Sequence, residues 1–390
     1  MASTDPEERL AGLVADLVRI ETENPPGNER ACAEFMADWF EERGIDATLV
    51  GEPDPSRPNV AARLGEGEPT LVLNGHTDVV PAGDRSEWSY DPYGAERDGT
   101  RLYGRGSTDM KAGLALAMLT AERLREPIES GELDGSLVVH GAMGEETADP
   151  GTRALLEAGF DGDYGIVLEP TEFVTATSEK GLAWYEIVVE GEASHASRPD
   201  QGSNAIRNAE PVLDALADYD RAVRQREDEL VGRAYATVTQ FVAGAESNKG
   251  VVPDRAVLSL DRRFLPDESA AELDDELDHL LTAVAEEHDV TVDWERTQTY
   301  GSAAVDRDCH LAEVLREHSV AVADVPTAPW GTKASSDVRN LINDAGMEAV
   351  VWGPGSNDQA HTVDEFVDVA EAAPGLEILD RVARELLSTD

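Results

Sequence analysis

Histidines and carboxylates, the residue types that bind metal ions, follow several strand-like segments of this sequence. His76 and Asp78 come shortly after the apolar run 71–73, and residues two apart on an extended backbone point to the same side. A metal-bound imidazole usually donates its other ring N–H to a carboxylate, and Asp78 is placed to accept it. Alone, this pair is also typical of a hydrogen-bonded histidine at a strand end, so its meaning depends on the other motifs.

Further candidates follow other apolar runs of the chain, at residues 137–139, 166–168 and 349–352. A glycine-rich turn at 104–113 carries one more carboxylate and opens a helical segment. In open α/β sheets, ligands bind outside the carboxyl ends of the strands, where these residues are expected. Two histidines and three carboxylates form the ligand set of a two-metal site whose N and O donors suit zinc and its neighbours. The residues concerned are His76, Asp109, Glu169, His361 and one of the adjacent pair Glu145-Glu146.

The motifs resemble those of the M20 family of metallopeptidases and deacylases. Five separated patterns occur in the family's order, from the segment 18–29 with its Asn-Pro-Pro-Gly turn to His361-Thr362. The resemblance implies a metal-dependent hydrolase that cleaves the amide bond of an N-acyl amino acid, of the acetylornithine deacetylase or succinyl-diaminopimelate desuccinylase type. A carboxypeptidase or dipeptidase of the same family, acting on small peptides, is the alternative. A non-catalytic binding protein that retains the fold is a third interpretation.

The resemblance also implies a role for each residue of the site. Asp109 bridges two divalent metal ions, zinc with cobalt or manganese as alternatives. His76 and Glu169 complete the first position, and Glu146 and His361 complete the second. Glu145 and Asp78 are the implied catalytic residues. Adjacent side chains on an irregular segment diverge, so Glu146 can bind metal while Glu145 serves as the general base.

Three residues of a second segment also match family motifs. His195 takes the position of a histidine that reaches the active site of a partner subunit and polarises the scissile carbonyl, while a surface histidine is the alternative. Arg263 takes the position that binds the substrate carboxylate, a role that suits the planar fork of guanidinium donors. The family commonly has asparagine where this chain has Gly250. Asn248 is therefore the candidate for an asparagine contact with substrate.

The charge of the chain limits its partners and suggests its surroundings. The net charge is −48, from 80 acidic and 32 basic residues, of which only four are lysine. The acids are spread among ordinary apolar periods, which is typical of a globular protein from a high-salt cytoplasm where charges are screened. Such a charge argues against nucleic acids and anionic membranes as partners. Residues 1–9 lack an apolar signal core, and no apolar run approaches ~20 residues, so we expect a soluble, cytoplasmic protein.

The order of predicted elements indicates two domains. Helices at 6–18 and 29–43 precede strands at 47–50, 59–64, 71–73, 137–139 and 166–168, with helices at 114–124 and 152–158 between them. This alternation predicts an α/β, layered, zinc-peptidase-like catalytic domain. From residue 179 the order βαββαβ predicts a ferredoxin-like α+β lid. We therefore expect a catalytic domain in two parts, 1–178 and 297–390, that ends in a helix at 367–387. The inserted domain, 179–296, is expected to form a homodimer by the resemblance.

Overall fold

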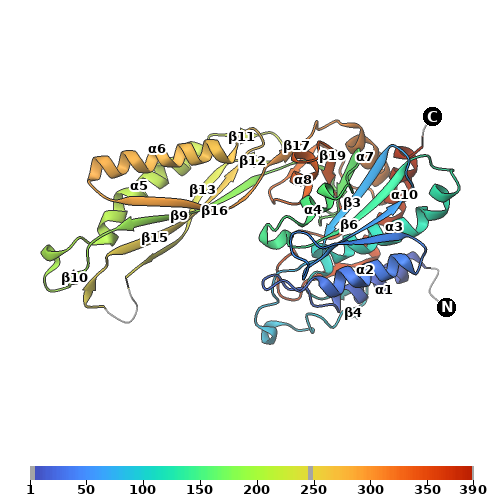
Figure 1. Cartoon of the computed structure of the whole chain (residues 1–390), viewed down its shortest axis with the longest axis horizontal. Coiled ribbons are helices and arrows are strands. Elements are labelled where there is room, and N and C mark those ends of the chain that lie inside the picture. The colour runs from blue at the N-terminus through green and yellow to red at the C-terminus, as the bar shows by residue number, and fades with distance from the viewer. Residues whose placement is uncertain (1–4, 245–248, 389–390) are drawn as a thin grey trace. The chain divides into compact units, whose positions relative to one another are not determined.

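The computed structural model describes residues 5–244 and 249–388, which fold into two compact units (Figure 1). The first unit contains the chain up to Ser178, Ala304–Gly331, and the chain from Ser336 onward. The second unit contains Glu179–Ala303 and Thr332–Ser335. The chain thus leaves the first unit, builds the second and returns. Of the helices in the described residues, none is both long enough and apolar enough for a membrane span.

A mixed β-sheet forms the centre of the first unit. β3 runs parallel to β6 and β7, and β7 runs parallel to β19. All seven residues of β3 and all seven of β6 are buried, as expected for parallel strands covered on both faces. The carboxyl ends of these parallel strands therefore meet at one edge of the sheet. In spatial order, seven of its nine strands are β1 (Asp46–Val50), β2 (Asn59–Leu64), β6 (Ser136–Ala142), β3 (Thr70–His76), β7 (Tyr164–Val167), β19 (Glu348–Val351) and β8 (Ala176–Glu179).

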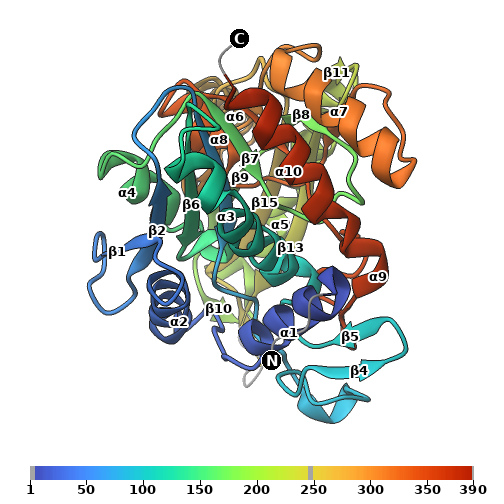
Figure 2. The ribbon, with the colours of Figure 1, turned by 90° about the vertical axis from the view of Figure 1, so that its right-hand side faces the viewer.

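Helices cover both faces of this sheet. The larger core lies under five of them, and Figure 2 shows two of these, α3 and α10, on the face turned toward the viewer. The five are α1 (Pro6–Val18), α2 (Arg30–Glu41), α3 (Ala112–Glu129), α7 (His310–Ala323) and α10 (Pro374–Leu386). On the opposite face, α4 (Gly151–Glu157) packs Leu155 against Ala61 and Ala142, and α8 (Val338–Asn343) lies beside α4. The first helix begins where predicted, because Asp5 accepts a hydrogen bond from the backbone of Glu7.

Close packing at one glycine fixes the approach of α3 to the sheet. A Cβ on Gly113 would lie 2.3 Å from the carbonyl oxygen of Leu168, which is closer than any non-bonded carbon and oxygen approach. Only glycine allows the start of this helix to lie so near the end of β7. The loop before α3 and the residue after Leu168 are thereby held at the same edge of the sheet.

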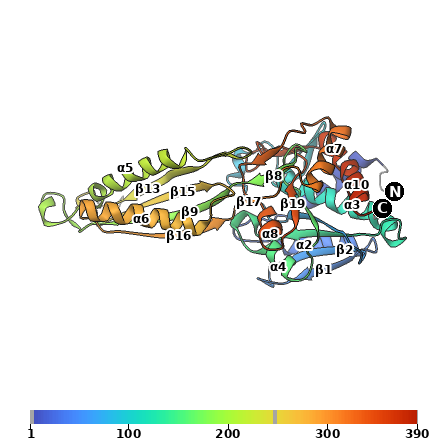
Figure 3. The same ribbon diagram turned by 90° about the horizontal axis from the view of Figure 1, so that it is seen from above.

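The second unit is a four-stranded antiparallel sheet with two helices. The strand order is β13 (Tyr235–Ala243), β15 (Arg255–Phe264), β9 (Gly181–Glu190) and β16 (Val292–Tyr300). The helices α5 (Ala205–Val223) and α6 (Ala270–His288) run along these strands (Figure 3). Ser269 and Glu272 form a reciprocal capping box that starts α6. The order βαββαβ with these pairings is ferredoxin-like, so the predicted fold class is confirmed.

The predicted helix over 367–387 is wrong in its first part. Residues Phe366–Asp368 form strand β20, which pairs with β5 (Arg101–Tyr103), and β5 pairs with β4 (Glu96–Asp98). Asp368 then accepts hydrogen bonds from the backbone of Ala370 and Glu371, and this cap begins the short helix α9 (Val369–Ala372) before α10. The other short strands are β10 (Ser194–His195), β11 (Glu227–Asp228), β12 (Gly232–Arg233), β14 (Val251–Val252), β17 (Ala303–Ala304) and β18 (Trp330–Thr332).

Candidate active site

Strand ends and the loops beside them bring the five candidate ligands to one edge of the first unit's sheet. His76 is the last residue of β3, which extends three residues beyond the predicted strand. Glu146 lies in a single helical turn after β6, and Glu169 follows β7 closely. Asp109 lies in the loop before α3, where its backbone is extended (φ −118°, ψ 93°). His361 lies in the loop between β19 and β20.

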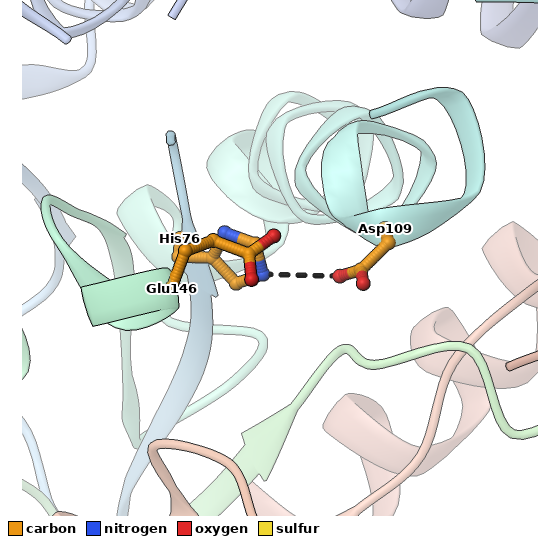
Figure 4. Close-up of side chains that lie close together, drawn as sticks. All are labelled: His76, Asp109 and Glu146. Carbon is orange, nitrogen blue, oxygen red and sulfur yellow. Dashed lines mark hydrogen bonds and ion pairs between the residues drawn. The ribbon is translucent and has the colours of Figure 1, made fainter. Parts of the chain in front are cut away.

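Asp109 lies between the two histidines. Its Oδ1 is 3.1 Å from Nε2 of His76, and its Oδ2 is 3.2 Å from Nε2 of His361. Nε2 of His76 is also 3.7 Å from Oε1 of Glu169, and Nε2 of His361 is 3.1 Å from Oε2 of Glu146. Figure 4 shows Asp109 facing His76, with Glu146 beside them. One carboxylate is thus shared between two groups, each with one histidine and one further glutamate.

These donor atoms fit metal ions. Zinc bonds of ~2.0–2.1 Å in a tetrahedron place neighbouring ligand atoms about 3.3 Å apart, and the four separations above lie between 3.1 and 3.7 Å. His76, Asp109 and Glu146 offer ligand atoms within 4.8 Å of one another. In the part of the chain that the structure describes, Oε1 of Glu146 is buried without a hydrogen-bond partner. The residues therefore fit a site for divalent cations.

The structure disfavours the charged form of each glutamate in this cluster. Burial raises the pKa of Glu145, Glu146 and Glu169, and the charges of neighbouring carboxylates raise each of them further. Positively charged neighbours act in the opposite direction, since His76 lowers the pKa of all three. A buried group of carboxylates needs positive charge to stay ionised. Divalent cations would supply that charge.

Asp78 has a different role in the structure from the one expected at the sequence level. Nδ1 of His76 lies 2.9 Å from the backbone oxygen of Asp78, whereas the nearer carboxylate oxygen is 3.6 Å away, beyond hydrogen-bond distance. The carboxylate instead accepts hydrogen bonds from the backbone of Gly144, Glu145 and Glu146 at 2.9 to 3.2 Å. Asp78 thus orients His76 through its main chain and the glutamate turn through its side chain.

Two residues that the sequence did not single out complete this arrangement. Nδ2 of Asn24 donates to Oδ2 of Asp78 at 2.9 Å and to the hydroxyl of Thr147 at 2.7 Å. Nη1 of Arg339, a buried side chain, lies 3.7 Å from Oε1 of Glu145. Asn24 belongs to the Asn-Pro-Pro-Gly motif, and this motif is the sequence feature that could have identified it. Arg339 had none, because it reaches Glu145 from a helix nearly two hundred residues further along the chain.

His361 adopts a backbone conformation that is uncommon for a residue with a side chain. Its φ is +61°, in the left-handed region that persists only when the surroundings enforce it and that often marks functional sites. Hydrogen bonds to Asp109 and Glu146 raise the pKa of His361 to about 10. Its side chain is 53% exposed, in contrast to 2% for His76. Of the two histidines, His361 is therefore the more accessible to solvent.

The remaining candidates belong to the second unit. His195 is exposed on β10, and its Nδ1 accepts a hydrogen bond from the backbone of Ser197 at 3.1 Å. A neutral ring in this arrangement carries its proton on Nε2. Nε and Nη2 of Arg263 bind the two carboxylate oxygens of Asp261 at 2.8 and 3.1 Å. Asn248 lies outside the described residues.

Comparisons with known proteins identify the family of this chain. The sequence profile of "Peptidase family M20/M25/M40" matches residues 72–385. A probable succinyl-diaminopimelate desuccinylase of Staphylococcus epidermidis is 29% identical over 388 residues, which cover 93% of each chain. An acetylornithine deacetylase of Vibrio atlanticus is 30% identical, with 92% of each chain covered. The crystal structure of a dinuclear metal binding peptidase of Bacillus subtilis has a TM-score of 0.70 at 17% identity, with 98% of each chain covered.

Proposed function

The chain belongs to peptidase family M20/M25/M40 and is a metal-dependent hydrolase, and from that premise we propose that it uses two divalent metal ions to cleave the amide bond of an N-acyl amino acid. The observation that carries this proposal is the position of Asp109, whose two oxygens face His76 and His361 separately. Asp109 would then help to hold both ions, one together with His76 and Glu169 and the other together with Glu146 and His361. Zinc is the first choice from the donor set, with cobalt or manganese as alternatives.

The proposed roles of the chain's own residues follow from their places. When bound, the ions supply Lewis-acid polarisation and make a bound water more acidic. Glu145 takes the proton of the attacking water on its carboxylate and later gives it to the leaving amine. Arg339 lies 3.7 Å from this carboxylate and favours its charged form. Asp78 holds the turn on which Glu145 and Glu146 lie.

The substrate proposed first is an N-acetyl or N-succinyl amino acid. Two relatives with matching length carry the names acetylornithine deacetylase and probable succinyl-diaminopimelate desuccinylase. The runner-up is a carboxypeptidase or dipeptidase activity on small peptides. The Bacillus subtilis protein with the same fold is a peptidase, which supports this alternative. Arg263 would bind the substrate carboxylate in either case, with Asp261 holding the guanidinium. Neither activity involves nucleic acid or membrane.

We further propose that the second unit forms a homodimer and that His195 acts on the substrate bound by the partner chain. The hydrogen bond from Ser197 to Nδ1 leaves Nε2 as the donor toward a developing oxyanion. Mixing Glu145→Gln chains with His195→Ala chains tests this. Random pairing of equal amounts makes about half the dimers mixed, each with one intact site, so up to a quarter of the wild-type activity should return. Verified subunit exchange without recovered activity would refute the shared site.

A substrate panel tests the proposed reaction. Protein stripped of metal and reloaded with zinc or cobalt is incubated with N-acetylornithine, N-succinyl-diaminopimelate and a set of dipeptides, and the release of free amine is measured. We expect hydrolysis of an N-acyl amino acid by the reloaded protein and none by the stripped protein. Hydrolysis of dipeptides alone would establish the runner-up. No hydrolysis of either class by metal-loaded protein would contradict both.

A further inference from the structure

Glu365 has a buried carboxylate group. It contacts residues throughout the loop 104–109, which carries Asp109. Its Oε2 accepts hydrogen bonds from Nη1 of Arg105 at 2.6 Å and from the backbone of Gly106 at 3.0 Å. Its Oε1 accepts from the backbone of Thr108 at 3.0 Å and of Asp109 at 3.2 Å. Its own carbonyl oxygen accepts from the backbone of Gly104 at 2.8 Å. Every residue that Glu365 contacts here lies between 104 and 109.

Burial makes these contacts strong. The relative exposure of Glu365 is 0% and that of Arg105 is 3%. Hydrogen bonds to an ionised group are about twice as strong as neutral ones, and the loss of one partner in a buried site leaves the other unsatisfied. The loop also lacks a regular helical or strand conformation of its own, since Asp109 and Met110 have non-helical dihedral angles. The conformation of this loop therefore depends on its contacts with other segments, and Glu365 contacts most of its residues.

A short β-ladder aligns the segment that follows Glu365 with the segment that precedes the loop 104–109. β20 begins at the residue after Glu365, and β5 ends at the residue before Gly104. Phe366 pairs with Tyr103 in this ladder. The segment before Glu365 carries His361, which approaches Oδ2 of Asp109. One stretch of chain thus holds the backbone of Asp109 and places a histidine at its side chain.

We propose that Glu365, paired with Arg105, is a positioning residue that sets the carboxylate of Asp109 for both metal positions. The proposal rests on the two-metal function above. Since the two oxygens of Asp109 face different histidines, a change in its backbone alters both positions at once. The carboxylate of Asp78 differs from that of Glu365 in this respect, because it holds the turn of Glu146 and so affects the second position.

The test is the metal affinity of Glu365→Gln, measured by competition with a chromophoric chelator for zinc and by the visible spectrum of the cobalt-loaded protein. Glutamine can accept at one oxygen only, so its amide nitrogen would face N–H donors. Loss of a partner of this kind typically costs 10–100-fold in metal affinity. We expect at least a ~10-fold loss for both ions and an altered cobalt spectrum. Asp380→Asn is the matched control, because Asp380 is a buried carboxylate that pairs with Arg123 and Arg384 on the first unit, away from the loop.

Arg105→Gln provides a second variant in case Glu365→Gln does not fold. It removes the charge beside Glu365 and keeps the backbone contacts, so a smaller loss for both ions is expected. Wild-type affinity for both ions in either folded variant would overturn the proposal. Failure of both variants to fold at saturating zinc would also overturn it, since the pair would then be a structural element. Wild-type protein measured in parallel separates these results from a failure of the two-metal function, which would appear in the wild type itself.

Discussion

Asp78 accepts a hydrogen bond from the backbone of Glu146, with 3.2 Å between that nitrogen and Oδ2. Two more backbone donors of the same turn, Gly144 and Glu145, bind Oδ1. A carboxylate accepts at both oxygens, whereas an amide presents donors at one of them. The orientation of the turn therefore depends on the charge and shape of this side chain.

Asp78→Asn should lower kcat at least ~10-fold, in the range found for residues that orient metal ligands. His76 keeps its partner in this variant, because it contacts the backbone oxygen of Asp78. We expect weaker binding of one ion, the one held by Glu146 and His361, and near-normal binding of the other. Steady-state kinetics and metal competition measure both effects. Asp84→Asn is the control, since Asp84 also binds a backbone N–H, in an exposed turn. Selective loss of the other ion, the one held by His76 and Glu169, would show that the side chain of Asp78 acts on His76 instead.

Glu145→Gln should abolish turnover while the metal content and the fold remain. The amide keeps the shape of the side chain but cannot accept a proton, and general base catalysis contributes at least ~10²-fold. Rates of amine release, with metal analysis of the same sample, measure the effect. Near-normal turnover in a metal-loaded variant would place the base elsewhere.

The pH dependence of stability should include a contribution from His140. Burial lowers the pKa of His140 from 6.5 to about 4, and the ring lies between Phe160 and Asn74, with Nε2 2.8 Å from the carbonyl oxygen of Phe160. The unfolded state therefore binds one more proton between these pH values. The contribution of His140 to the free energy of unfolding is fully present above pH 6.5. It is lost as the pH falls toward 4, at about 1.4 kcal/mol per pH unit.

Urea unfolding of wild type and His140→Gln at several pH values measures this contribution. The variant lacks the titrating ring, so its free energy of unfolding should fall less steeply between pH 6.5 and 4. The difference between the two curves is the readout, because the carboxylates titrate in both proteins. Parallel curves would mean that His140 is protonated in the folded state as readily as in the unfolded state.

The acidic surface leads to a prediction about salt. The net charge of −48 should destabilise the compact state by mutual repulsion unless ions screen it. The midpoint of thermal unfolding should rise as potassium chloride increases from millimolar to molar concentrations. A flat or falling curve would count against a high-salt origin.

Much of the fold could be predicted because its elements carry strong local signals. The helix at Pro6–Val18 and the strand at Asn59–Leu64 have the predicted bounds, since their apolar periods are clear and end at caps or turns. The strand at Phe366–Asp368 was missed because its three residues carry no period, and only pairing with Arg101–Tyr103 makes it a strand. Tertiary contact decided its structure.

The same distinction holds in the site. Residues such as His76 could be singled out because motifs at strand ends have recognisable types and spacing. Glu365 and Arg339 act through contacts with segments about two hundred residues or more away. The side chain of Asp78 was assigned to His76, but the backbone N–H groups of the folded turn bind it instead. Such contacts depend on loop conformations that no local pattern records.

The most direct test of the two-metal site is a titration of metal-free protein with zinc or cobalt, following bound ions per chain and hydrolysis of the best substrate together. A shared carboxylate at Asp109 predicts about two ions per chain, with full activity only when both are bound. Asp109→Asn should lose both ions, since its two oxygens face separate histidines. Full activity of the wild type with a reproducible limit of one ion per chain would contradict the bridging role of Asp109.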